Sequence, residues 1–111
     1  MSEIRINGRT LRARTERKRV SNNRQRALRR GLRADLSLMD WALRLAQFDF
    51  SCAYCGRPFY TMDHVLPLGN GGGTTFVNVV PCCEECNSRK GAAVWLPAVA
   101  ESNRTKLSGG I

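Results

Sequence analysis

The sequence predicts a small α+β domain with a four-cysteine metal knuckle, preceded by a basic, mainly helical N-terminal arm. Two Cys-x-x-Cys pairs, Cys52/Cys55 and Cys83/Cys86, enclose 27 residues in which strand and loop patterns alternate. An apolar stripe at helical spacing precedes the first pair. A chain of 111 residues buries only a modest core, so a structural metal would add stability that the core alone does not supply.

Basic charge is concentrated in residues 1–33, which hold twelve Lys and Arg against two acidic residues. Residues 34–111 hold six basic and seven acidic residues, so the excess behind the net charge of +9 lies in the N-terminal arm. Such an arm favours nucleic acid over a membrane, because it lacks aromatic and leucine anchors. The expected DNA contacts are Arg12, Arg14, Arg17, Lys18, Arg19, Arg24, Arg26, Arg29 and Arg30. For the free arm, a helix over about 10–30 and a partly disordered tail that orders on a phosphate backbone both stay open.

The next segment is predicted to be an amphipathic helix, with Asp35 or Ser37 placed to cap its start. Apolar residues recur at helical spacing in two adjoining stripes, Leu36, Met39, Leu43 and Ala46 beside Leu38, Trp41, Leu45 and Phe48. This helix is expected to pack on the metal-binding domain, and packing on a second copy of itself, as a homodimer, stays open.

Short elements follow the amphipathic helix. A knuckle turn, a strand, a glycine-rich loop, a second strand and a helix are expected at 52–56, 59–65, 69–73, 76–80 and 83–93. Pro67 is expected to end the first strand and Pro81 the second, while Trp95, Leu96 and Val99 cover the site. The predicted division is a nucleic-acid-binding arm at 1–33, the amphipathic helix at 34–50, the metal-binding domain at 51–100 and a flexible tail at 101–111.

The five cysteines, with no secretory leader expected, favour metal binding in a reducing cytoplasm over disulfides. Cys52, Cys55, Cys83 and Cys86 can supply four thiolates to a structural zinc ion. Cys82 adjoins Cys83, but only Cys83 leaves a two-residue gap to Cys86, so Cys82 is expected to be buried packing. The alternative is that the cysteines are free or redox-active. Apolar runs in the sequence fall short of the roughly 20 residues of a membrane span.

Between the cysteine pairs, His64, the chain's only histidine, follows Asp63 directly. A neutral imidazole can accept a proton from water, and Asp63 and Asn87 offer hard oxygen ligands for Mg²⁺ or Mn²⁺. Together these groups satisfy what the hydrolysis of a phosphodiester requires. Asn78 is expected to orient the imidazole through its side chain or backbone. The alternatives are a structural or zinc-bound His64, and an Asn78 that only ends a turn.

Two cations follow Asn87 on the last expected helix. Arg89 and Lys90 are predicted to meet phosphates, as a planar fork and a point charge, and the alternative is a solvated helix face. The glycines of residues 69–73 are expected to let the backbone approach DNA closely.

An ordered set of motifs spans residues 52–91. It reads Cys-x-Tyr-Cys-Gly, Thr61-x-Asp63-His64-x-x-Pro67, Gly-Gly, Asn78-x-Val80-Pro81 and Cys83-x-x-Cys86-Asn87-x-x-Lys90-Gly91. This set resembles the HNH endonuclease family in its zinc-supported ββα-metal form. The resemblance implies one divalent ion between Asp63 and Asn87, water activated by His64, products with 5′-phosphate and 3′-hydroxyl ends, and contact with the DNA minor groove. Asn87 stands where the name-giving pattern has its final histidine, which leaves the preferred ion open.

The sequence therefore predicts a metal-dependent DNA endonuclease that nicks one strand per site. Small HNH proteins of this build resemble those encoded by bacterial viruses near their packaging genes. The resemblance thus implies a role in genome processing or packaging, a packaging-machinery protein as partner, and the cytoplasm of a bacterial host as location. A zinc-ribbon nucleic-acid-binding module without catalysis is the alternative function, and an RNA-directed nuclease also stays open.

Overall fold

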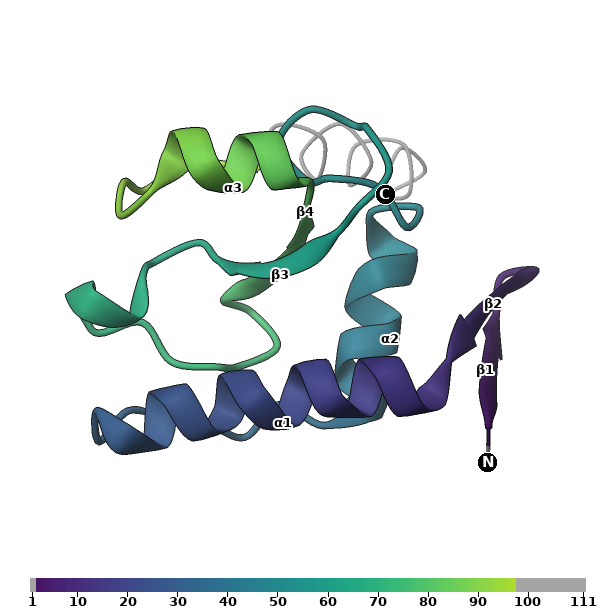
Figure 1. Ribbon diagram of the computed structural model, residues 1–111, viewed down its shortest axis with the longest axis horizontal. Coiled ribbons are helices and arrows are strands. Elements are labelled where there is room, and N and C mark those ends of the chain that lie inside the picture. Colours follow the sequence, from purple (N-terminus) through teal and green to yellow (C-terminus); the bar gives the residue numbers. More distant parts are fainter. Residues whose placement is uncertain (1, 98–111) are drawn as a thin grey trace, which may run out of the picture.

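The computed structural model describes residues 2–97, which form two antiparallel β-hairpins, three α-helices and one short 3-10 helix (Figure 1). The elements in chain order are β1 (Glu3–Ile6), β2 (Arg9–Arg12), α1 (Ala13–Arg29), α2 (Leu38–Gln47), β3 (Thr61–His64), η1 (Leu68–Asn70), β4 (Val79–Cys82) and α3 (Glu84–Lys90). The fold is a small α+β domain, as the sequence predicts.

The basic N-terminal segment is packed against the rest of the fold. Strands β1 and β2 pair across a turn at Asn7 and Gly8, which both have positive φ, and α1 follows β2 directly. Apolar side chains from this segment enter the main core, including Ile4, Leu11 and Val20. Of the two alternatives for the segment, the helix is the one observed, and the hairpin before it was not predicted from the sequence.

Helix α2 begins where the sequence predicts a cap. Ser37 and Asp40 form a capping box, in which the Ser37 hydroxyl accepts from the Asp40 backbone N–H at 3.0 Å. The helix buries Trp41 and Leu45 completely between α1 and β4. The Trp41 indole N–H donates to the buried carboxylate of Glu16 on α1 at 2.9 Å. Most of the apolar residues in the two predicted stripes therefore pack inside this molecule.

The hairpin β3–β4 carries Asp63 and His64, and its second strand lies later in the chain than predicted. Strand β4 runs from Val79 to Cys82, so Pro81 lies inside it, opposite Met62, instead of ending it. In a two-stranded sheet each strand has a free edge, where a proline nitrogen needs no partner. The Pro81 carbonyl accepts from the Ala53 N–H at 2.8 Å and so ties the cysteine knuckle to the strand. Helix α3 is shorter than predicted, with Cys83 as its N-cap.

Two glycines of the loop after β3 allow close packing between parts of the protein. A Cβ on Gly72 would lie 1.9 Å from the Leu66 carbonyl oxygen, and one on Gly73 would lie 2.4 Å from the Arg33 carbonyl oxygen. These glycines therefore admit neighbouring protein backbone, which differs from the expected role of admitting DNA.

The segment after α3 covers the knuckle only in part. The Trp95 ring meets Tyr54 edge-on at 5.6 Å between centroids, but Leu96 is 81% exposed, so its predicted role as a cover is wrong. Val99 and the tail expected at 101–111 lie outside the described residues. Within residues 2–97, none of the helices is both long and apolar enough to cross a membrane.

Candidate functional site

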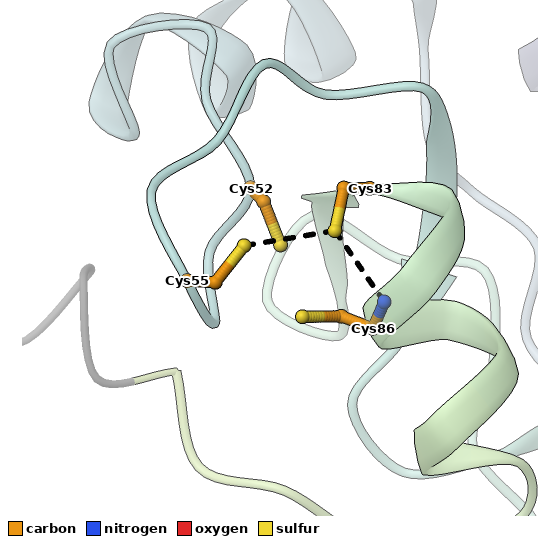
Figure 2. A group of neighbouring side chains, drawn as sticks. All are labelled: Cys52, Cys55, Cys83 and Cys86. Atoms are coloured by element: carbon orange, nitrogen blue, oxygen red, sulfur yellow. Dashed lines mark hydrogen bonds between the residues drawn. The ribbon is translucent and has the colours of Figure 1, made fainter.

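Four cysteine side chains converge between the knuckle and the start of α3 (Figure 2). The Sγ atoms of Cys52, Cys55, Cys83 and Cys86 all lie within 4.8 Å of one another. Tetrahedral zinc with Zn–S bonds of about 2.3 Å would set the sulfurs about 3.8 Å apart. Backbone N–H groups of Tyr54 and Cys86 point at the sulfurs of Cys52 and Cys83, each at 3.4 Å. The donor set and its spacing fit one structural zinc ion.

The fifth cysteine stays outside this group. Cys82 is fully buried, and its thiol donates to the Cys83 carbonyl at 3.3 Å. Burial raises the pKa of the Cys82 thiol far above its usual range. Cys82 thus has the position expected of a packing residue.

His64 ends β3 and lies almost wholly buried. Its Nε2 atom is 2.9 Å from the hydroxyl of Thr74, and that hydroxyl donates to the Asn23 carbonyl of α1, also at 2.9 Å. The pKa of His64 is lowered to about 4: burial is the largest cause, the positive charges of Arg26 and Lys90 act in the same direction, and the carboxylate of Asp63 opposes them. The imidazole is therefore neutral near pH 7 and able to accept a proton.

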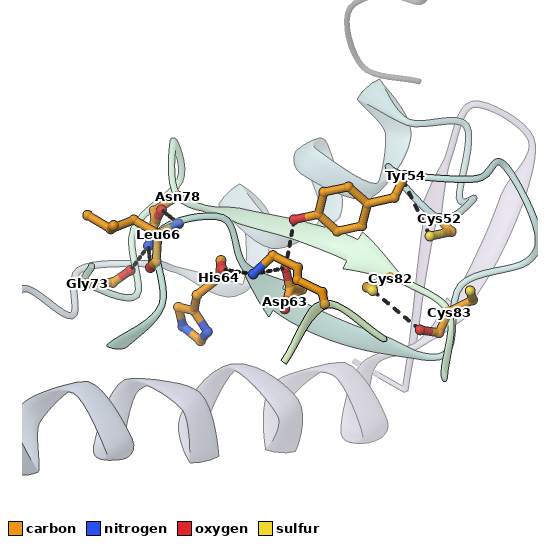
Figure 3. Close-up of polar contacts among 10 residues, drawn as sticks. Cys52, Tyr54, Asp63, His64, Leu66, Gly73, Asn78, Cys82 and Cys83 are labelled. Carbon is orange, nitrogen blue, oxygen red and sulfur yellow. Dashed lines mark hydrogen bonds and ion pairs between the residues drawn. The ribbon is translucent and has the colours of Figure 1, made fainter. Parts of the chain in front are cut away.

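Asp63 is also buried and is held from two sides. One carboxylate oxygen accepts from the Tyr54 hydroxyl at 2.7 Å (Figure 3), and the same oxygen lies 3.2 Å from the Lys90 ammonium group. Burial and the contact with Asp63 raise the pKa of Tyr54, so its hydroxyl keeps its proton. Lys90 also donates to the His64 carbonyl at 3.0 Å. The ammonium of Lys90 is thus buried and paired, which corrects the expectation that Lys90 meets phosphates from the helix surface.

Asn78 does not contact the imidazole, contrary to the sequence-based expectation. Its side-chain oxygen accepts from the Leu66 N–H at 2.9 Å, and its amide donates to the carbonyls of Leu66 at 3.0 Å and Gly73 at 2.8 Å (Figure 3). Its own carbonyl accepts from the Val65 N–H. Asn78 therefore fixes the loop after β3. The residue that hydrogen-bonds to the imidazole is Thr74, and no local sequence pattern predicts this contact.

Of the four candidate catalytic residues, all but Asn78 line one cleft of about 340 Å³. Asp63 and His64 line it from β3, Asn87 from α3, and Arg26 from α1. The Asn87 side chain is exposed and makes no hydrogen bond within the described residues, so its amide oxygen is available to an ion. Helix α1 thus forms a wall of the cleft, which composition alone did not predict.

The basic residues of the N-terminal segment do not all have the same role. Arg19 binds Glu16, donates to the Tyr60 carbonyl at 3.0 Å and stacks on the Phe59 ring, so it holds the fold together and is not a free DNA contact. Arg24 donates to the Ala34 carbonyl at 3.0 Å while staying exposed. The remaining predicted contacts on this segment are exposed: Arg12, Arg14, Arg17, Lys18, Arg26, Arg29 and Arg30. On α3, Arg89 is also exposed, 3.6 Å from Glu85.

A β-hairpin followed by a helix, joined by a four-cysteine cluster, defines an α+β domain of the type found in zinc-supported HNH folds. Residues 52–101 match the family described as HNH endonuclease. The chain is also 42% identical over 52 residues to the CRISPR-associated endonuclease Cas9 of Corynebacterium diphtheriae. That match covers 40% of this chain and 5% of the Cas9 protein, so the similarity is to a small part of the larger protein.

Proposed function

We propose that this chain is a metal-dependent DNA endonuclease that nicks one strand per visit. The observation that carries the proposal is the convergence of His64, Asp63 and Asn87 on a single cleft. The match of residues 52–101 to the HNH endonuclease family supports a nucleic acid as substrate.

His64 is the group we assign to proton transfer. Because its pKa is about 4, the imidazole is unprotonated at working pH and can take a proton from the attacking water. It is the chain's only histidine, and it lies at the end of β3 in the wall of the cleft. Asp63 precedes His64 in the sequence, but its side chain contacts Tyr54 and Lys90, whereas the imidazole contacts Thr74. We therefore assign separate roles to the two side chains.

Asp63 and Asn87 are the residues that would hold a divalent ion such as Mg²⁺ or Mn²⁺. A carboxylate oxygen and an amide oxygen are suitable ligands, and both residues line the same cleft. When bound, the ion would stabilise charge on the phosphate and on the leaving oxygen. Lys90 already balances the charge of Asp63, so we expect tight ion binding only when a substrate phosphate adds its own charge.

The four cysteines are assigned to a structural zinc ion. The zinc would join the knuckle at residues 52–55 to the start of α3 and so hold both ends of the β3–β4 segment. The fold would then keep the cleft in shape while zinc takes no part in the reaction.

Substrate contact is assigned to exposed arginines on two walls. Arg26 lines the cleft from α1, and Arg89 lies exposed on α3. The other exposed basic residues of α1 would follow the DNA backbone away from the cleft. The setting that we propose from the resemblance is viral genome processing or packaging in a bacterial cytoplasm.

The test is cleavage of supercoiled plasmid by zinc-loaded protein with Mg²⁺, Mn²⁺ or EDTA. We expect nicking with either ion, none with EDTA, and none with His64→Ala, while the exposed control Met39→Ala cuts like the wild type. DNA binding without cleavage under any ion would instead favour a non-catalytic zinc-ribbon module. An RNA substrate in the same assay separates an RNA-directed nuclease from a DNA-directed one.

A further inference from the structure

We infer that Thr74 is the positioning residue of the catalytic imidazole, and that it holds His64 in the tautomer with its proton on Nε2. Nδ1 is then the atom that accepts the proton from water. The catalytic meaning of this inference rests on the proposed function, whereas the tautomer is a property of the protein itself.

Counting protons at the Thr74 hydroxyl gives the tautomer. The hydroxyl has one proton and two polar neighbours, the Asn23 carbonyl and His64 Nε2, each at 2.9 Å. A carbonyl can only accept, so the hydroxyl proton goes to Asn23 and an oxygen lone pair faces the imidazole. Thr74 has no exposed surface, so water cannot supply the missing donor. Nε2 must therefore carry a proton and donate it to Thr74.

The other ring nitrogen of His64, Nδ1, has no hydrogen-bond partner within the described residues. No buried side-chain nitrogen or oxygen in this part of the chain lacks a partner. Nδ1 is therefore not sealed in the core, and His64 lines the cleft beside Asp63. An unprotonated ring nitrogen that is open to the cleft is what a general base needs.

Thr74 is itself fixed by the N-terminal part of the chain. Its N–H donates to the Arg33 carbonyl at 2.8 Å, its carbonyl accepts from the Leu36 N–H at 3.2 Å, and its hydroxyl donates to Asn23. The neighbouring Gly73 permits this approach, because a side chain there would strike Arg33. Through these contacts with Thr74, the segment that precedes the HNH domain determines which ring nitrogen of His64 carries the proton.

A single histidine makes the tautomer directly measurable. Protein labelled with ¹⁵N-histidine gives one imidazole, and two-bond ¹H–¹⁵N correlations tell which ring nitrogen carries the proton. The sample is zinc-loaded full-length protein without Mg²⁺, near neutral pH. We expect the Nε2–H form in the wild type and in Thr74→Ser, which keeps the hydroxyl. Thr74→Val keeps the shape but removes the hydroxyl, and we expect the fixed preference for Nε2–H to be lost.

Activity provides the second measurement. We expect Thr74→Val to nick plasmid at least about tenfold more slowly than the wild type at saturating Mg²⁺, and Thr74→Ser to stay within about threefold. A purely structural role of Thr74 would alter the melting temperature but leave the tautomer unchanged.

Two results would overturn the inference. One is a wild-type spectrum with the proton on Nδ1, which needs no variant and does not depend on folding of Thr74→Val. The other is a folded Thr74→Val with the wild-type tautomer and wild-type nicking. If the spectra follow the expectation but no form of the protein nicks DNA, the positioning of His64 by Thr74 stands and the proposed nuclease function fails.

Discussion

At the residue scale, the end of β3 shows how two adjacent side chains receive different environments. Asp63 is held by Tyr54 from the knuckle and by Lys90 from α3. His64 is held by Thr74, which in turn is bound to α1. Each partner comes from a different part of the chain, so the site exists only when those parts are assembled. The partners therefore control stability as well as chemistry.

Replacing the buried Lys90 by Met should destabilise the protein by about 3 kcal/mol, because the charge of Asp63 is then buried without its counter-ion. Urea unfolding of zinc-loaded protein measures the change. Mg²⁺ should recover part of the loss, and more than it adds to the wild type, because Lys90 no longer competes for Asp63. The matched control is Arg89→Met, an adjacent and 72% exposed cation that should change stability by less than about 0.5 kcal/mol. A Lys90→Met protein as stable as the wild type would contradict the importance of this ion pair.

His64 should remain neutral to well below the pH at which a free histidine protonates. Its pKa is about 4 when folded and 6.5 when unfolded, because burial and the charges of Arg26 and Lys90 disfavour the imidazolium more than Asp63 favours it. Between these values the unfolded chain binds more protons, so stability rises with pH. The contribution, about 3 kcal/mol, is complete above pH 6.5 and is lost as the pH falls toward 4.

The ¹H NMR titration of this single histidine gives the folded pKa directly. The stability effect follows from urea unfolding of the wild type and of His64→Asn as a function of pH, since groups other than His64 affect both proteins. The difference between the two curves should shrink as the solution becomes acidic. A measured pKa at or above 6.5 would show that the imidazole is more exposed than the structure indicates.

At the scale of elements, features encoded by neighbouring residues were predictable and contacts between distant segments were not. The cysteine spacing and the Ser37 cap of α2 depend on residues close in sequence, and both are observed. The predicted position of β4 is wrong because a proline usually ends a strand, whereas a two-stranded sheet tolerates Pro81 at its free edge. The Thr74–Asn23 bond joins residues 51 positions apart, and no local periodicity reports such a pair.

The loop after β3 docks on the N-terminal segment through a glycine whose replacement should be costly. We expect Gly73→Ala to lose about 2 kcal/mol of unfolding free energy, because its Cβ would lie 2.4 Å from the Arg33 carbonyl oxygen. Gly69→Ala is the matched control in the same loop, since a Cβ there meets nothing within 4 Å. It should be neutral or slightly stabilising. Thermal and urea unfolding of both variants test the pair, and equal stabilities would show that the loop can dock another way.

At the scale of the whole molecule, the N-terminal segment and the HNH domain share one hydrophobic core. That core includes Ile4, Leu11 and Val20 from the first part of the chain, Trp41 from α2, and Val79 from β4. The charge distribution suggests a separable arm, but the packing shows a structural part of the fold. We therefore expect that removal of residues 1–33 prevents folding, so a deletion cannot measure the contribution of this segment to DNA binding.

Charge substitution on the exposed side chains of α1 isolates that contribution. Arg14, Arg17 and Lys18 are exposed, so replacing all three by Gln should leave the fold intact. If each contacts a phosphate, the variant should bind duplex DNA more weakly, and the slope of log affinity against log salt should fall in magnitude by up to about 2.7, because each contact releases close to one counterion. Fluorescence anisotropy over a range of salt concentrations measures both quantities. The matched control replaces Arg14 and Arg17 by Lys and leaves Lys18, which keeps all three charges and should keep the slope. An unchanged slope in the Gln variant would mean that DNA follows another surface, and that α1 contributes to the site only as the wall that carries Arg26 and fixes Thr74.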